Sequence, residues 1–155
     1  MPARLVKTET VVKAAPAHVW EVLTDTATFP LWNPFAREVS GPLEPGGRLT
    51  VRIDLDGRTM TFKPTVSLVD PPCELRWEVV IGHPRLFHVE RGFQVLEHAT
   101  GRTRFVQWER CTGLLVPAVF LGGYEAKLYR GYDAMNQALR IRAESSPAPA
   151  GDPSG

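Results

Sequence analysis

Two residues of opposite charge, Arg91 and Glu109, fall on strand faces that are otherwise apolar. Residues 86–97 and 102–112 alternate in hydropathy as antiparallel strands do. The Ala-Thr-Gly between them predicts a hairpin with a three-residue loop and with Gly101 in a left-handed conformation. In that register Arg91 lies opposite Glu109. Because an unpaired buried charge is costly, we predict an Arg91–Glu109 pair that points into a cavity.

This pair has two chemical interpretations. In the first, Arg91 binds a ligand carboxylate or polarises a carbonyl while Glu109 accepts a proton, so that both are candidate catalytic residues. In the second, they form a structural ion pair near the cavity rim. The register also has an alternative, because a two- or four-residue loop would place Arg91 opposite Arg110 and turn Trp108 toward the core.

Aromatic side chains supply the material for an apolar binding site. In the same register Phe93 faces Gln107, on the face that carries Arg91. The candidate ligand-binding residues are Trp32, Phe62, Trp77, Arg91, Phe93, Gln107, Glu109, Tyr124 and Tyr132. Their rings would enclose a flat hydrophobic ligand, and the tyrosine hydroxyls would fix its polar groups. The alternative for each ring is that it fills the core. Trp20 and Phe29 are assigned to helix packing.

The other chemistry-bearing residues predict neither a metal centre nor a nucleophile. The histidines share no metal-ligating spacing, and surface positions are expected for His18, His83, His88 and His98. Cys73 and Cys111 lie outside any paired-cysteine spacing, which suits a reducing cytoplasm. No serine lies in a nucleophile-elbow motif. We therefore expect no metal and no cofactor.

The charge balance excludes partners that bind through a strong field. Lys plus Arg total 18 and Asp plus Glu 17 in 155 residues, a formal net charge of +1. We therefore expect no nucleic-acid partner. No run of 18 apolar residues and no apolar leader is present, so we expect a cytoplasmic protein without an integral membrane segment, either monomer or homodimer.

The elements that position these residues follow from two periodicities. Residues 5–13 predict a strand, followed by a helix that begins near Pro16 and by a second short helical turn. Hydropathy then alternates with period two from residue 46 to residue 112, which predicts an antiparallel meander with Pro64 at a bulge or an edge. Residues 116–143 return to helical spacing and predict one long amphipathic helix, which Gly122 and Gly123 loosen or kink near its start.

Two segments stand apart from this pattern. Residues 145–155, SSPAPAGDPSG, cannot bury enough apolar surface to offset their ordering entropy and predict a disordered tail after one domain of residues 1–144. Residues 113–122, GLLVPAVFLG, form the most apolar stretch. They predict an entrance flap, a dimer contact or core, and an exposed patch there would indicate a partner or a membrane surface.

Five short motifs, taken together and in this order, resemble the SRPBCC (START-like) superfamily, most closely its polyketide cyclase/dehydrase-type branch of small bacterial proteins. They are Ala15-Pro16-x-x-Val19-Trp20-x-x-Leu23-x-Asp25, Trp32-Asn33-Pro34-Phe35, Phe62-x-Pro64, Pro72-x-x-Leu75-x-Trp77 and Tyr132-x-x-Met135-Asn136-x-x-Leu139. The resemblance covers residues 5–144. It implies an α+β helix-grip fold in which a curved antiparallel sheet of six to seven strands wraps around a long C-terminal helix. Two short helices would follow the first strand, and a deep cavity would lie between sheet and helix.

The resemblance implies less about activity, because this fold serves carriers, enzymes, receptors and chaperone regulators. Our leading hypothesis is that the protein binds a small hydrophobic molecule, aromatic, polyketide-like or lipid-like, in its cavity. One alternative is an aromatase/cyclase-type enzyme in which Arg91, Glu109 and a tyrosine promote enolisation and dehydration. A second alternative is a protein-interaction module similar to Hsp90-activator domains, which would show a filled core and an exposed apolar patch.

Overall fold

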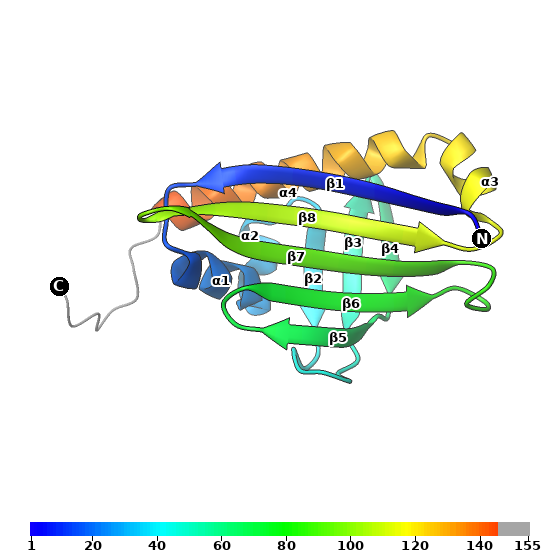
Figure 1. The fold of residues 1–155 in the computed structure, drawn as a ribbon, viewed down its shortest axis with the longest axis horizontal. Helices are drawn as coiled ribbons and strands as arrows, with labels where there is room; N and C mark the ends of the chain where they lie inside the picture. The colour runs from blue at the N-terminus through cyan, green and yellow to red at the C-terminus, as the bar shows by residue number, and fades with distance from the viewer. Residues whose placement is uncertain (146–155) are drawn as a thin grey trace.

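Two antiparallel sheets and a long C-terminal helix make up the fold (Figure 1). The computed structural model describes residues 1–145, so all of the predicted tail except Ser145, the last residue of the final helix, lies outside the described residues. In chain order the elements are β1 (Ala3–Val12), α1 (Pro16–Thr24), η1 (Thr26–Thr28), α2 (Phe29–Trp32), β2 (Ala36–Ser40), β3 (Thr50–Leu55), β4 (Arg58–Phe62), β5 (Thr65–Asp70), β6 (Glu74–Val80), β7 (His88–Ala99), β8 (Arg102–Thr112), α3 (Val116–Leu121) and α4 (Tyr124–Ser145).

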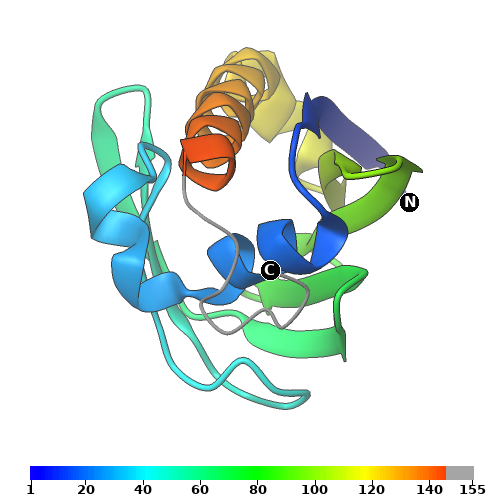
Figure 2. The same ribbon diagram turned by 90° about the vertical axis from the view of Figure 1, so that its left-hand side faces the viewer.

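The predicted helix-grip arrangement is confirmed. Five strands form one sheet in the order β1-β8-β7-β6-β5, and three form the other in the order β2-β3-β4. Figure 2 shows α4 lying between β1 and the three-stranded sheet, with α1 across the near end. The buried stripe of α4, which includes Leu128, Tyr132 and Leu139, therefore faces the inner surfaces of both sheets.

The strand pattern differs from the prediction in the number of strands. The described residues form eight strands rather than six or seven, because residues 36–40 add β2, a short strand that the period-two search did not include. Of the two positions predicted for Pro64, the edge is the one found: Pro64 lies between two edge strands at a change of sheet, because β4 ends at Phe62 and β5 begins at Thr65 in the other sheet. Between them the sheets share one isolated bridge, from Arg48 to Thr65. A proline suits this break because it has no N–H to donate to a ladder.

The predicted single helix over residues 116–143 is divided into α3 and α4. Gly123 has a φ of 80°, a left-handed conformation that ends α3 and allows the chain to start a new helix. The 22 residues of α4 span about 33 Å. The Gly-Gly pair therefore separates a short helix from the long one, where only a loosened or kinked start was expected.

The hairpin of β7 and β8 has the register on which the candidate site depends. Arg91 lies opposite Glu109 and Phe93 opposite Gln107, so the predicted register is confirmed and the alternative with Arg110 is wrong. The predicted three-residue loop is wrong: the tip is a two-residue turn in which Ala99 pairs with Arg102, and a bulge between residues 97 and 99 adds the residue that keeps the register. Gly101 has the expected left-handed φ of 70°.

Candidate ligand-binding site

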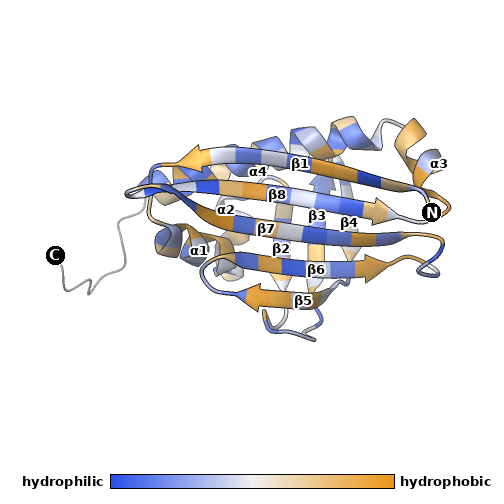
Figure 3. Cartoon of the chain, in the orientation of Figure 1, coloured by the Kyte–Doolittle hydropathy of each residue, from blue (hydrophilic) through white to orange (hydrophobic). Residues whose placement is uncertain are grey.

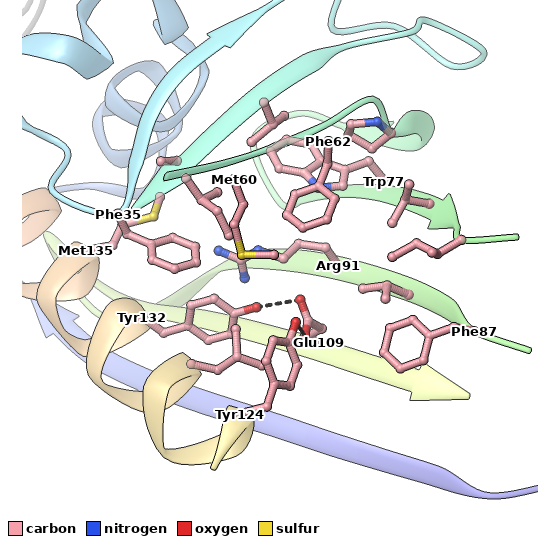
Figure 4. A pocket seen from close by; sticks show the side chains of 18 of the residues that line it. Phe35, Met60, Phe62, Trp77, Phe87, Arg91, Glu109, Tyr124, Tyr132 and Met135 are labelled. Atoms are coloured by element: carbon pink, nitrogen blue, oxygen red, sulfur yellow. Dashed lines mark hydrogen bonds between the residues drawn. The ribbon is translucent and has the colours of Figure 1, made fainter. Parts of the chain in front are cut away.

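A cavity of about 330 Å³ lies between the two sheets and the α3–α4 segment. Its wall is almost entirely apolar, built from aliphatic and aromatic side chains of β3, β4, β6, β7, α3 and α4. Among residues 1–145, Arg91 and Glu109 are the only charged residues that line it, and the hydroxyls of Tyr124 and Tyr132 join them (Figure 4). The polar groups of the cavity are therefore concentrated on the β7–β8 hairpin and the facing turns of α4.

Arg91 is held among aromatic rings and is 6% exposed. The guanidinium carbon lies 4.0 Å from the ring centre of Tyr132 and 4.4 Å from that of Phe93, close enough for cation–π attraction. Nη2 donates a hydrogen bond of 2.5 Å to Oε1 of Gln107. Nη1 is buried and makes no hydrogen bond in the structure. A cavity-lining cation therefore keeps one donor group unused.

A chain of buried amides supports Arg91 from behind the cavity wall. Gln107 donates through Nε2 to Oδ1 of Asn136 at 2.6 Å and to the backbone oxygen of Tyr132 at 3.2 Å. Asn136 in turn donates through Nδ2 to the hydroxyl of Thr8 at 3.0 Å. The relay joins β7, β8, α4 and β1, so it fixes the Arg91 side chain relative to the sheet and the helix.

Glu109 collects three donors beside the cavity. The hydroxyl of Tyr132 donates to Oε1 at 2.8 Å, and the hydroxyl of Tyr124 donates to Oε2 at 3.0 Å. The thiol of Cys111 lies 3.4 Å from Oε2 and donates to it. Burial is the main cause that raises the pKa of Tyr124, Tyr132 and Cys111 well above its ordinary value, and the neighbouring Glu109 carboxylate raises each pKa further. These three groups therefore stay protonated at neutral pH and serve as hydrogen-bond donors to Glu109.

The predicted direct ion pair between Arg91 and Glu109 is wrong, although their backbone positions are paired. Within residues 1–145, no nitrogen of Arg91 approaches a Glu109 oxygen within the 4.0 Å of a salt bridge. Arg91 instead turns its guanidinium over the Tyr132 and Phe93 rings toward Gln107, and the two tyrosines take up the carboxylate. Arg91 and Glu109 are thus each bonded to neutral side chains, an amide for Arg91 and hydroxyl groups for Glu109, in place of the expected ion pair.

The structure brings most of the predicted site residues to one cavity. Those that line it are Phe62, Trp77, Arg91, Phe93, Glu109, Tyr124 and Tyr132. Gln107 is fully buried but lies behind Arg91 rather than on the wall. Trp32 lies outside the cavity lining: its ring packs edge-on against Phe29 at 5.1 Å, and its Nε1 donates to Thr28.

Sequence reasoning assigned some lining residues elsewhere or omitted them. Phe29, assigned to helix packing, lines the cavity. Met60 lines it as well, from β4. Asn136 was named only as part of a motif, yet it is fully buried and anchors the amide relay. The sequence signal that would have identified it is its spacing, since Asn136 follows Tyr132 by four residues and therefore lies on the same face of an amphipathic helix.

Among the described residues there is neither a metal-ion cluster nor a membrane-spanning helix. Residues 1–145 hold no cluster of three or more His, Cys, Asp or Glu side chains suited to a metal ion. The described helices include none that is long and apolar enough to cross a bilayer.

His18 departs from the expected surface position: its side chain is 12% exposed, and Nε2 donates to the backbone oxygen of Ala143 at 3.0 Å. It therefore joins α1 to the last turn of α4.

Comparisons with known proteins agree with this architecture. The model of a family described as polyketide cyclase/dehydrase and lipid transport matches residues 3–144. The Zhui aromatase/cyclase from Streptomyces sp. R1128 superposes with a TM-score of 0.75 at 21% identity, over 97% of this chain and 99% of that chain. A START superfamily protein from Mycobacterium smegmatis has a TM-score of 0.70 at 17% identity, over 90% of this chain and 97% of that chain.

A third solved structure widens the range of relatives. Norcoclaurine synthase from Thalictrum flavum has a TM-score of 0.64 at 13% identity, over 92% of this chain and 94% of that chain. At such identities the likeness concerns the fold. No curated protein sequence matched the chain.

Proposed function

The chain belongs to the polyketide cyclase/dehydrase and lipid transport family, and we propose that it binds a small hydrophobic ligand carrying a polar oxygen group in the cavity of about 330 Å³. The volume lies within the range of small-molecule pockets. Aromatic lining residues such as Phe62, Trp77 and Phe93 suit a flat or aromatic ligand. Both described cysteines are free, which supports a reducing cytoplasm as the proposed location.

One observation carries the proposal: Nη1 of Arg91 is buried at an apolar cavity wall and has no hydrogen-bond partner. Leaving a charged donor unsatisfied costs more than the roughly 1–3 kcal/mol of a neutral group. A ligand carboxylate, phenolate or carbonyl oxygen would remove this cost, while the ligand's apolar body fills the cavity. The ligand class is therefore a hydrophobic molecule with an acidic or carbonyl oxygen.

Native mass spectrometry of protein purified from its own host tests this proposal. We expect a co-purifying species in the wild type and its loss in Arg91→Met. The matched control is Arg76→Met, which removes an arginine from the outer face of β6 and should retain the species. An empty spectrum for wild type, together with no binding of added aromatic acids, would contradict the proposal.

A second candidate function is catalysis of the aromatase/cyclase kind. It is favoured by the position of Glu109. Two tyrosine hydroxyls hold its carboxylate at the wall of the cavity, which Arg91 also lines. In this reaction Glu109 removes a proton from a carbon next to a carbonyl group, and Arg91 stabilises the enolate oxygen that forms. The enolate then expels the hydroxyl group as its carbon–oxygen bond breaks, a tyrosine protonates the departing oxygen so that it leaves as water, and the proton held by Glu109 passes back to the tyrosine through their hydrogen bond.

A linear poly-β-keto thioester analogue tests the catalytic candidate. We expect Glu109→Gln to lower kcat by about a hundredfold or more while the analogue still binds. Tyr132→Phe should lower kcat by less, because Tyr124 also lies on the cavity wall. Binding of the analogue without any turnover by wild type would eliminate catalysis and leave the binding function in place.

The third hypothesis, a protein-interaction module, required a filled core. The open cavity speaks against that role, although an exposed apolar patch is present beside it.

A further inference from the structure

Large apolar side chains gather at the end of the molecule formed by α3 and the turn between β6 and β7. We call this surface the apolar rim and define it as Val80, Ile81, Leu86, Leu114, Leu115 and Leu121. Leu121 is 88% exposed and Leu114 62% exposed, and the other four are 39–45% exposed. Figure 3 shows α3 as an orange, hydrophobic segment at this end. Three residues of the apolar rim, Leu114, Leu115 and Leu121, belong to the apolar stretch 113–122, of which only Leu115 and Val119 line the ligand cavity.

The two segments of the apolar rim are joined at the edge of the cavity. The backbone N–H of Leu114 donates to the carbonyl of Arg85 at 2.9 Å, and that of Leu115 donates to the carbonyl of Leu86 at 3.1 Å. These bonds tie the start of the α3 segment to the β6–β7 turn. Ile81 and Leu115 belong to the apolar rim and also line the cavity. An apolar ligand leaving the cavity past these residues would therefore remain in contact with apolar surface.

The two segments that carry most of the apolar rim contain arginine but no carboxylate, and acidic residues of the chain, Glu78 and Glu125 among them, lie just outside them. Residues 81–87 and 113–124 contain no aspartate or glutamate. Arg85 lies in the β6–β7 turn and is exposed. Arg4 is also exposed, and its guanidinium lies 5.7 Å from the ring centre of Phe120 in α3. Two cations thus flank exposed leucines, although the chain as a whole has a net charge of only +1.

We propose that the apolar rim docks on the surface of an anionic lipid bilayer. Leu121 and Leu114 are the most exposed members of the apolar rim, and acyl chains would close around them from several sides. Arg85 and Arg4 would then lie at the level of the negatively charged headgroups. This interaction goes beyond the proposed ligand function, since it uses the outside of α3 and requires no residue of the Arg91–Glu109 group.

Sedimentation with lipid vesicles tests the docking surface. Vesicles of phosphatidylglycerol and phosphatidylcholine should bind the wild type, and vesicles of phosphatidylcholine alone should bind it less. Leu121→Asp should weaken binding to the anionic vesicles about tenfold or more, because it removes a buried leucine and adds a negative charge. Arg85→Ser and Arg4→Ser should each weaken it about fivefold.

The matched control is Leu31→Asp, which makes the same change at a leucine of α2 that is 75% exposed and lies well away from α3 (Figure 1). It should leave vesicle binding unchanged. Thermal unfolding of Leu121→Asp should match wild type, since the side chain is almost free of contacts. Ligand binding in solution should also persist, so that failure of docking is distinguishable from failure of the ligand site.

Three results would overturn the docking proposal. The first is wild-type protein that stays in the supernatant with anionic vesicles. The second is an equal loss of vesicle binding in Leu31→Asp and Leu121→Asp. The third is a concentration-dependent dimer that Leu121→Asp abolishes while vesicle binding is absent, which would assign the apolar rim to contact between two copies of the chain.

Discussion

Two arginines on neighbouring strands show how differently the two faces of one sheet use the same residue type. Arg76 on β6 lies on the outer face, where its Nε donates to Glu74 at 2.7 Å and its guanidinium stacks 5.4 Å from the ring centre of Trp108. Arg91 on β7 lies on the inner face, also stacked on aromatic rings, but with an amide as its hydrogen-bond partner.

The difference lies in how each charge is compensated. A carboxylate satisfies Arg76, and the hydrogen bond to Glu74 is the main cause that raises the pKa of Arg76. Its side chain is 37% exposed, so water supplies its other contacts. Arg91 has ring faces, Gln107 and a nitrogen without a partner. The charge of Arg76 is therefore compensated by Glu74 and solvent, whereas Arg91 keeps one nitrogen that can donate a hydrogen bond to a ligand.

Removing the inner carboxylate should have the largest effect on stability. In Glu109→Leu, the hydroxyls of Tyr124 and Tyr132 lose their acceptor, and the buried Arg91 loses the carboxylate on the adjacent strand. We expect the free energy of unfolding to fall by about 3–5 kcal/mol. Glu74→Leu should cost about 1 kcal/mol or less, since its partner is partly exposed. Urea unfolding of both variants measures the contrast, and equal losses would refute it.

The second-largest effect on stability should come from alkaline pH, which acts on the three donors around Glu109. The pKa values of Tyr124, Tyr132 and Cys111 are raised in the folded protein from ordinary values of 10.0, 10.0 and 9.0. Above pH 9 the unfolded chain therefore releases protons that the folded chain keeps, so the free energy of unfolding falls as pH rises. The slope should reach about 1.4 kcal/mol per pH unit for each proton.

Urea midpoints between pH 8 and pH 11 measure this slope. Tyr132→Phe should lower the slope by the contribution of one proton, about 1.4 kcal/mol per pH unit, because the buried hydroxyl is removed. Tyr129→Phe, at an exposed tyrosine of the same helix, is the control and should leave the slope unchanged. A slope that is the same in all three proteins would contradict the assignment.

Gln107→Leu should have a smaller effect than Glu109→Leu. It removes the acceptor of Arg91 and one partner of Asn136, but it leaves no carboxylate unpaired. We expect a loss of about 2 kcal/mol in the free energy of unfolding. Gln137→Leu, at an exposed glutamine of α4 that bonds Arg140, should change it by less than about 0.5 kcal/mol. If the two variants are equally stable, the amide relay does not hold Arg91.

The sequence predicts backbone features of this site better than side-chain geometry. Strand alternation in residues 102–112 leaves the register open, and an expected three-residue loop ending in a left-handed Gly101 is the reason to place Arg91 opposite Glu109. The loop is a two-residue turn instead, and the bulge at residue 98 keeps Arg91 opposite Glu109. The sequence does not determine which rotamer a long side chain adopts among competing partners, so the expected ion pair is replaced by contacts to Gln107 and Tyr132.

The other differences have similar causes. Trp32 was grouped with the pocket by residue type, yet the turn of α2 directs its ring onto Phe29. The break between α3 and α4 depends on the positive φ of Gly123, a conformation that glycine permits but does not require. The cavity itself depends on how two sheets and a helix meet, which no periodicity within one segment reveals.

The most direct test compares the two arginines by calorimetry with anilinonaphthalene sulfonate, an aromatic anion, as the probe. We predict that wild type and Arg76→Met bind the dye with equal affinity, and that Arg91→Met binds it about tenfold or more weakly, as expected when a charge-assisted hydrogen bond is lost. Equal affinities for Arg91→Met and wild type would contradict the central claim that the free nitrogen of Arg91 receives the polar group of the ligand.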